Sequence, residues 1–220
     1  MYKPDTNLVR LTGLLVITTL SMPLARGAEP GPLQQLDQLL EEMNTLTADV
    51  TQLIIESDGG VLEESDIRMM LKRPDGFSWE TLSPFPELVV TDGKQLWNYQ
   101  PDLEQVVVED WDQSRSELAA QLLAGNTENL DQEYLVNLRE TDSAEFTEFT
   151  LTPRAADNIY RQINLTFQNR NLDMIFIDSS NGQKTVWQFR NLSINSEIPD
   201  SAFVFVPPVG VEVIFNSYVD

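Results

Sequence analysis

The sequence predicts a mainly β protein in which helices lie over one apolar face of an antiparallel sheet. Short segments of alternating apolar and polar residues recur along most of the chain, and turn signals such as Asp92-Gly93 separate them, which indicates hairpins. One amphipathic helical segment precedes these strands, and a second helical segment interrupts them. Each helix has an apolar side that needs a sheet to cover.

Alternation and turn signals together place the expected strands. Asp58-Gly59-Gly60 separates the first two strands, and Asn181-Gly182 separates two later ones. Because such short links join neighbouring strands as hairpins, we expect mostly antiparallel pairing. The expected strands are residues 48–56, 61–73, 77–81, 86–91, 95–100, 104–109, 134–140, 145–152, 161–168, 172–178, 184–194 and 203–206.

The first helix is expected at residues 32–46. Pro32 suits the first turn of a helix, and the opposite side of the segment carries acidic and amide residues. Apolar side chains recur at helical spacing along it, at Leu33, Leu36, Leu40 and Met43.

The second helix is expected at residues 112–126, between two groups of strands. Leu118, Leu122 and Leu123 give it one apolar face, and Gly125 is a typical stop. A helix inserted among the strands of an antiparallel sheet must cover something, so this segment is a candidate lid.

Strict alternation predicts which side chains point to the covered face. In residues 66–72 the odd positions are apolar and the even positions are mostly charged, and the same pattern recurs in two later strands. A concave apolar face follows, which is either a filled core or a ligand cavity. Its candidate residues are Met69, Leu71, Phe77, Trp79, Phe149, Leu151, Ile163, Leu165 and Phe167.

Arg73 continues the same inward series and is the most informative single residue. A guanidinium is permanently charged and carries five donors, so on an inward face it must find acceptors. Two interpretations stay open from spacing alone: an ordinary salt bridge at the end of a strand, or a functional latch on backbone carbonyls.

Residues 1–28 are expected to be a secretory signal peptide, and residues 29–220 a single domain. Lys3 and Arg10 precede a short apolar region, and small residues around Gly27 suit cleavage. The apolar region is too short for a comfortable membrane span. We therefore expect an exported protein without stable membrane insertion.

Composition excludes several classes of function. The chain has no Cys and no His, which removes thiol chemistry and the commonest general base and metal ligand. Its formal net charge is −21, and without residues 1–28 it keeps 11 of 14 basic and 34 of 35 acidic residues, or −23. Nucleic acid and anionic lipid repel such a chain. The acidity is either a device for solubility or salt, or an attraction to a basic partner.

The sequence shows no convincing catalytic constellation. GFSWE at residues 76–80 has the outline of a nucleophile elbow, but Glu80 replaces the second glycine and no histidine can serve as base. Acidic pairs such as Asp102 with Glu104 are plentiful, as expected on solvated turns at this acidic content. We expect a protein that is not an enzyme and binds neither a metal nor a cofactor.

Three segments, taken in order, resemble one known family. They are LKRPDGFSWE at residues 71–80, LVVTDGKQLWNYQPDLEQV at 88–106 and FVFVPPVGVEVI at 203–214. The chain resembles the LolA family of periplasmic outer-membrane lipoprotein carriers, from the helix at Leu33 to Ile214. Three motifs in the family's order are much more specific than any one of them.

The resemblance implies an unclosed antiparallel β-barrel, or half-barrel, with a helical lid over its apolar concave face. It implies a periplasmic carrier that binds the acyl chains of lipoproteins there, without covalent chemistry. The implied partners are the acylated lipoproteins themselves, an inner-membrane LolCDE-type ABC transporter that supplies them, and a LolB-type outer-membrane receptor that accepts them. We expect this carrier to be a monomer.

The resemblance also assigns roles to residues. Arg73 occupies the arginine of the family's Lys-Arg-Pro motif, which hydrogen-bonds the backbone of the lid, and Phe77 corresponds to the cavity aromatic that follows it. Ser116-Glu117 stands where the family's lid helix often has Thr-Pro. Residues 90–109 are expected to be scaffold, as central hairpins with alternate aromatics facing inward.

Two other functions compete with that of the carrier. A receptor of the same fold needs a lipidated Cys after its signal peptide, and the chain has none. A periplasmic regulator that senses lipoprotein with a similar half-barrel is the alternative function; it would be expected to carry a further partner-binding domain, for which residues 29–220 leave little room.

Overall fold

The computed structural model describes residues 30–111, 118–123, 127, 129–139 and 143–216. The expected signal peptide, residues 1–28, therefore lies outside the described residues, as do both ends of the expected helix at 112–126.

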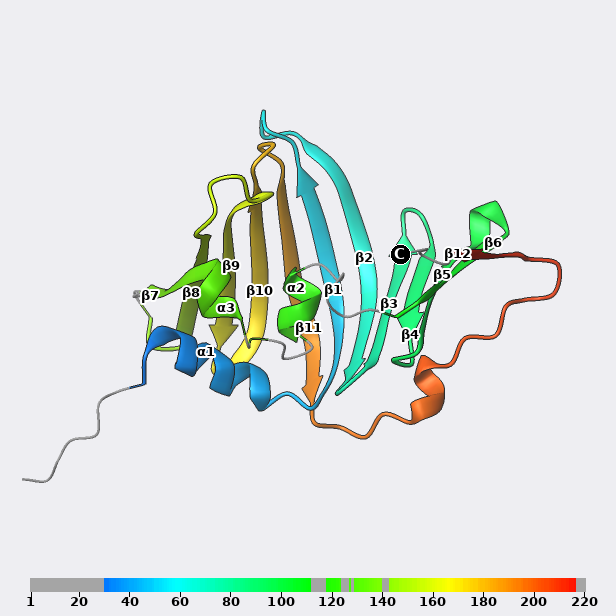
Figure 1. The fold of residues 1–220 in the computed structure, drawn as a ribbon, viewed down its shortest axis with the longest axis horizontal. Helices are drawn as coiled ribbons and strands as arrows, with labels where there is room; N and C mark the ends of the chain where they lie inside the picture. The colour runs from blue at the N-terminus through cyan, green and yellow to red at the C-terminus, as the bar shows by residue number, and fades with distance from the viewer. Residues whose placement is uncertain (1–29, 112–117, 124–126, 128, 140–142, 217–220) are drawn as a thin grey trace, which may run out of the picture.

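The molecule is built on one curved sheet of twelve strands that does not close on itself within the described residues (Figure 1). The strand order is β12-β6-β5-β4-β3-β2-β1-β11-β10-β9-β8-β7, and every neighbouring pair is antiparallel except β12 with β6. The mostly antiparallel open barrel expected from the sequence is thus confirmed. The strands are β1 Thr45–Ile55, β2 Val61–Lys72, β3 Gly76–Ser83, β4 Glu87–Thr91, β5 Gln95–Gln100, β6 Gln105–Asp110, β7 Tyr134–Arg139, β8 Phe146–Pro153, β9 Tyr160–Gln168, β10 Asn171–Ser179, β11 Lys184–Ile194 and β12 Glu212–Asn216.

Three short α-helices lie on one face of this sheet (Figure 1). They are α1 Pro32–Glu41, α2 Leu118–Leu123 and α3 Leu130–Glu133, and two 3-10 turns, η1 Pro101–Leu103 and η3 Asp200–Phe203, complete the described elements. Helix α3 was not expected from the sequence, because one helical turn shows no periodicity.

The expected end of the first helix at residue 46 is wrong, because the chain turns into β1 at Thr45. The Asn195 side chain accepts hydrogen bonds from the backbone N–H groups of Asn44 and Thr45 and donates one to the carbonyl of Glu42. A residue about 150 positions away therefore ends α1, and no local pattern reveals it.

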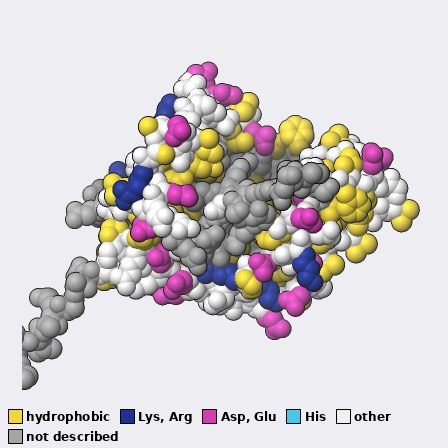
Figure 2. Space-filling view, viewed as in Figure 1, with side chains coloured by type: hydrophobic (Ala, Val, Ile, Leu, Met, Phe, Trp, Pro, Cys, Tyr) yellow, Lys and Arg dark blue, Asp and Glu magenta, His cyan; other side chains and the backbone are white. Residues whose placement is uncertain are grey.

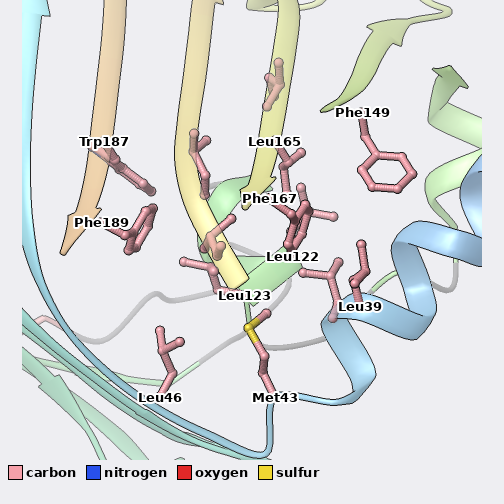
Figure 3. Close-up of a cluster of buried hydrophobic side chains, with 14 of the residues drawn as sticks. Leu39, Met43, Leu46, Leu122, Leu123, Phe149, Leu165, Phe167, Trp187 and Phe189 are labelled. Carbon is pink, nitrogen blue, oxygen red and sulfur yellow. The ribbon is translucent and has the colours of Figure 1, made fainter. Parts of the chain in front are cut away.

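The main core lies between this helical layer and the sheet (Figure 3). All three helices contribute to it, for example Leu36 and Leu40 of α1, Leu122 of α2 and Leu130 of α3, each at most 4% exposed. Burial of so much apolar area is the dominant stabilising contribution to the fold.

A second, smaller core lies on the opposite face of β2 to β5. Phe203 and Ile198 of the C-terminal segment pack there against Val90, Met70 and their neighbours. Trp97 belongs to this cluster, and the ring of Tyr99 lies 5.3 Å from that of Phe205. The expectation that the aromatics of residues 90–109 face inward is therefore wrong. These hairpins are also not central, since β4 to β6 lie near the β12 edge.

The C-terminal segment also corrects one strand. Residues 204–206, expected as part of a strand, form no ladder; Phe205 packs on the outer face by its side chain. The strand comes later, at β12, where Val213 pairs with Val106 in parallel. Two consecutive prolines, Pro207 and Pro208, separate the two places, and proline has no N–H to donate to a ladder.

The Asp-Gly turn between β4 and β5 makes a close contact with the turn between β2 and β3. Gly93 has a φ of +86°, and a Cβ on it would lie 2.3 Å from the Cβ of Asp75. The position needs glycine both for its conformation and for space. The two turns are thereby packed together beside Arg73.

Candidate functional site

The residues expected on the concave face come together in one cluster under the helices. Seven of them, from Met69 and Leu71 of β2 to Phe167 of β9, are at most 3% exposed, and Phe77 and Trp79 pack against them while partly buried. The register explains this, because Met69 pairs with Trp79 and Leu71 with Phe77, so the four share one face. The fully or nearly buried members are Met69, Leu71, Phe149, Leu151, Ile163, Leu165 and Phe167.

The lid leucines reach this cluster from α2. Leu122 and Leu123 are 0% and 1% exposed and point into the space beside Leu165 and Phe167 (Figure 3). Leu118 belongs to α2 by its backbone, and its side chain lies outside what the structure describes. An isolated helix of six residues is not stable in water, so α2 depends on the apolar contact that Leu122 and Leu123 make with the inner face.

Arg73 reaches from the end of β2 to the backbone of α2. Its Nη2 donates to the carbonyl oxygen of Leu123 at 3.2 Å, and its own backbone N–H donates to Asn44 O. Within the described part of the chain no carboxylate lies within ion-pair distance of it. The described contacts of Arg73 therefore include a bond to a backbone carbonyl and no ion pair, and its role as a latch stays a prediction.

The guanidinium of Arg73 is held at an electrostatic cost. Burial lowers the pKa of Arg73, and the nearby charge of Glu41 on α1 partly opposes that lowering. Its Nε–H is buried without a hydrogen-bond partner among the described residues. A buried donor without an acceptor costs free energy, so this arrangement of Arg73 is less stable than a fully hydrogen-bonded one.

Asp37 of α1 forms a second polar contact with the chain that follows α2. Its carboxyl faces the hydroxyl of Thr127, and its Oδ1 is buried without a hydrogen-bond partner in the described chain. Burial raises the pKa of Asp37; the Thr127 hydroxyl opposes this, and the charges of Glu41 and Asp131 add to it. Polar groups next to β2 and on α1 therefore both face the C-terminal end of α2 and the residue that follows it.

Lys72 and Arg73 are adjacent but serve opposite faces of the sheet. Lys72 Nζ donates to the carbonyl oxygen of Ile198 at 2.9 Å and forms an ion pair with Asp200, so it holds the C-terminal segment on the outer face. Successive residues of a strand point to opposite faces, which places Arg73 on the inner one. The role of Lys72 was missed because its partners follow about 125 residues later.

Aromatic residues of β11 complete the inner face and were also missed. Trp187 packs on Trp79, with ring centroids 4.9 Å apart, and its Nε1 donates to Gln52 Oε1. Phe189 lies two residues further on the same side of β11 and belongs to the same cluster. The alternation of Trp187 and Phe189 in the sequence is the signal that identifies them.

A pocket opens beside the inner face between α1 and the strands β8 to β10. Its volume is about 360 Å³, and Leu39 and Phe149 line it together with polar groups, including Gln38 and Arg170. The Arg170 guanidinium pairs with the carboxylate of Glu42 at 2.5 Å and links the β9–β10 turn to the residue after α1. The pocket therefore reaches from the surface to the edge of the buried cluster.

Neither a metal-binding cluster nor a helix suited to span a membrane is found among the described residues. They contain no group of three or more acidic side chains placed to hold a metal ion. No helix among them is long and apolar enough to cross a membrane.

Comparisons with known proteins agree on one family. Residues 41–206 match the family model described as outer membrane lipoprotein carrier protein LolA. An outer-membrane lipoprotein carrier protein from Chromohalobacter salexigens is 37% identical, over 91% of this chain and 95% of the relative's own length. Another, from Hahella chejuensis, is 34% identical, over 94% of this chain and 98% of the relative's own length. A solved structure of an uncharacterised conserved protein from Thermus thermophilus has a TM-score of 0.56 at 14% identity, over 83% of this chain and 98% of that one, which shows the fold alone.

The fold and the site define a class of protein: an open β-barrel whose apolar inner face lies under short helices, one of which is bonded by a half-buried arginine. Within that class, the chain belongs to the LolA family of outer membrane lipoprotein carrier proteins. The family resemblance that the three sequence motifs indicated is thus confirmed.

Proposed function

We propose that this protein is a periplasmic carrier that binds the acyl chains of outer-membrane lipoproteins against the apolar face under α1 and α2. The observation that carries the proposal is the bond from Arg73 to the backbone of α2, because it ties a short helix over an apolar cluster by one polar contact. Family membership supplies the class of cargo. The signal-like residues 1–28 support export to the periplasm.

The energetics favour exchange of the lid for an acyl chain. Burying a leucine contributes roughly 1.5–3 kcal/mol, so Leu122 and Leu123 together hold α2 with a few kcal/mol. An acyl chain contributes roughly 0.8 kcal/mol per buried methylene, which for a dozen methylenes is about 10 kcal/mol. The apolar contribution of the cargo therefore exceeds that of the lid, and the Arg73 bond only biases the exchange.

In this proposal the lid has two states. When cargo displaces Leu122 and Leu123, the Arg73 guanidinium loses the carbonyl of Leu123; when cargo leaves, the bond forms again. A charge-assisted bond of roughly 1.5–3 kcal/mol is enough to shift such an equilibrium without locking it. Re-formation of the bond thus helps to expel the lipoprotein.

The partners in the proposal follow from the family. A LolCDE-type transporter of the inner membrane would supply the lipoprotein, and a LolB-type receptor on the outer membrane would accept it. The protein acts as a monomer in this scheme, and no covalent bond is made or broken, so it needs no catalytic group, metal or cofactor.

A release assay tests the proposal. The purified chain without residues 1–28 is incubated with energised spheroplasts that have accumulated newly made lipoprotein and carry a matched transporter. The expected result is lipoprotein in the soluble fraction, bound to this chain in a one-to-one complex. If a demonstrably folded chain releases none, the carrier function is wrong.

A further inference from the structure

A second apolar surface lies at the opposite end of β3 from Arg73. The loop between β3 and β4 and the turn η1 lie side by side there and form what we call the turn surface. It contains an open pocket, which we call its cavity, of about 260 Å³, lined by Phe85, Pro86, Glu87, Gln100, Asp102 and Leu103. Such a volume is smaller than that of typical small-molecule sites and suits a single large side chain.

The apolar residues of this surface are unusually exposed. Phe85 is 68% and Leu103 65% exposed, although each is large and neither contributes to one of the two cores. Figure 2 shows hydrophobic side chains gathered toward the β4 to β6 end of this face, with acidic side chains beside them. Adjacent exposed apolar side chains with a polar rim are typical of an interaction site.

The turn surface is also preformed. Gln100 Nε2 donates to Glu87 Oε1 at 3.1 Å and links the two turns. Glu104, with a φ of +51°, closes η1 through its N–H to Pro101 O, and its carbonyl oxygen accepts from the N–H of Glu212. A surface fixed in this way loses little conformational entropy when a partner binds.

Charge indicates what the partner looks like. Glu87 and Asp102 line the cavity, Glu104 directly follows Leu103 at the end of η1, and none of the three forms an ion pair in the described part of the chain. The whole chain carries −21. A second copy of this chain and an anionic lipid surface are therefore both repelled, whereas lysine or arginine side chains are attracted.

The position leaves the lid free. In the β2–β3 hairpin Lys72 pairs with Gly76 at the Arg73 end, whereas Asp66 pairs with Ser83 at the other end, next to the turn surface. A partner bound at the turn surface therefore does not cover α2 or Arg73.

We propose that the turn surface docks a protein segment that presents a large apolar side chain flanked by lysine or arginine. The apolar side chain enters the cavity between Phe85 and Leu103, and the basic side chains meet Glu87, Asp102 and Glu104. This inference stands independently of the proposed carrier function, because it uses none of the residues of the inner face.

A labelled peptide tests the docking surface directly. Binding of fluorescein-Lys-Lys-Leu-Phe-Lys-Lys is followed by anisotropy at low salt, and the site is mapped by amide chemical shifts of the ¹⁵N-labelled chain. The expected result is shifts confined to residues 83–87 and 100–104, and binding at least about tenfold weaker for peptides with Ser-Ser in place of Leu-Phe or Glu in place of Lys.

Matched variants distinguish binding at the turn surface from non-specific hydrophobic binding. The double variant Phe85→Ser with Leu103→Ser should weaken peptide binding at least about tenfold. The control is the double variant Leu62→Ser with Ile159→Ser, whose side chains are 58% and 67% exposed and lie outside the turn surface. It should not change peptide binding. Equal loss in both pairs, or shifts elsewhere, overturns the proposal. So does flotation with phosphatidylcholine or phosphatidylglycerol vesicles that depends on Phe85 and Leu103, because the partner would then be lipid.

Discussion

At the scale of single residues, Arg73 shows how one side chain couples two layers. It follows the last residue of β2, and its only described side-chain contact by hydrogen bond is the carbonyl of Leu123. Burial lowers its pKa, so part of what the bond contributes is offset by the cost of burying the charge. Removal of the Arg73 side chain should therefore change the position of α2 more than it changes the free energy of unfolding.

Arg73→Leu should keep the free energy of unfolding within about 1 kcal/mol of wild type, because the lost bond and the lost burial cost of the charge nearly cancel. The variant should still bind lipoprotein but pass it on at least about tenfold more slowly, since the lid no longer competes with the cargo. Urea unfolding and a transfer assay to the receptor measure the two effects.

The control for this variant is Arg68→Leu, which lies on β2 five residues before Arg73 and is exposed and paired with Glu80. It should transfer at the wild-type rate. Arg73→Lys should not restore transfer, because an ammonium group lacks the planar donors of a guanidinium. Wild-type transfer by Arg73→Leu would show that the bond to α2 plays no part in release.

Asp37→Asn should raise stability at neutral pH and flatten its pH dependence. Burial raises the pKa of Asp37 above its ordinary value of 3.8, so the folded state binds a proton more readily than the unfolded state. Wild-type stability therefore falls as the pH rises from about 3.8 through the raised pKa, and this loss persists above it. Asparagine keeps a hydrogen-bonding partner for Thr127 and has no such loss.

Urea unfolding of both proteins between about pH 3 and 7 measures this difference. The two curves should converge at the acid end and separate as the pH rises. Asp157→Asn, which removes the charge of an exposed acid, controls for net charge. If it stabilises as much as Asp37→Asn does at neutral pH, the burial of Asp37 is not the cause.

At the scale of elements, the contact between the Asp92-Gly93 turn and Asp75 fixes the position of the β4–β5 hairpin against the β2–β3 turn. The hairpin lies outside the inner core, so its position next to Arg73 depends on this contact and on the outer cluster around Val90. The motif that begins with this turn is therefore structural.

Gly93→Ala should destabilise the protein by more than about 2 kcal/mol, because it combines a positive φ, which alone contributes roughly 1–2 kcal/mol, with a clash at 2.3 Å. Gly59→Ala is the matched control, since Gly59 has a φ of +90° and no atom within 4 Å of the added Cβ. Thermal unfolding should show a clearly smaller loss for the control.

A double variant isolates the clash. Asp75→Gly removes the Cβ that the new methyl group of Gly93→Ala would meet, so the combined losses of the two substitutions should be less than additive. Additive losses would mean that backbone conformation alone requires the glycine.

At the scale of the whole molecule, charge acts against compactness. With a net charge of −21 and −23 without residues 1–28, acidic groups repel one another over the entire surface. Several of the described ion pairs, such as Arg68 with Glu80 and Arg170 with Glu42, are largely exposed and contribute little. The two apolar clusters must outweigh this repulsion.

Sodium chloride should therefore stabilise the folded protein. Raising the salt from about 0.02 to 0.5 M shortens the Debye length from roughly 20 to 4 Å and screens the repulsion, so the urea midpoint should rise. Potassium chloride should act similarly, because screening depends on ionic strength. An unchanged or lower midpoint would show that self-repulsion is not a significant opposing term.

Much of the fold followed from the sequence because its signals are local. The period-2 pattern of Ile163, Leu165 and Phe167 fixes which face is buried wherever that strand lies, and the three are 0% exposed. Turn residues likewise place the hairpins between β4 and β5 and between β10 and β11. The concave face and the open sheet were therefore accessible from pattern and turn chemistry.

Other features depend on partners that are distant in sequence. Asn195 ends α1, Lys72 binds Ile198 and Asp200, and β12 pairs with β6 about a hundred residues earlier. Trp97 and Tyr99 alternate as an inward face would, yet the C-terminal segment covers them on the outer face. Alternation tells that two side chains share a face, but not which layer will cover it.

The sequence by itself determined the class of fold, most residues of the inner face, the inward position of Arg73 and, through three ordered motifs, the family. The tertiary structure decided that Arg73 donates to Leu123 O, that Asp37 meets Thr127, and that a second core lies on the outer face. The physical reason is that periodicity and turn chemistry are properties of neighbouring residues, whereas a hydrogen bond between layers exists only once loops have brought distant segments together.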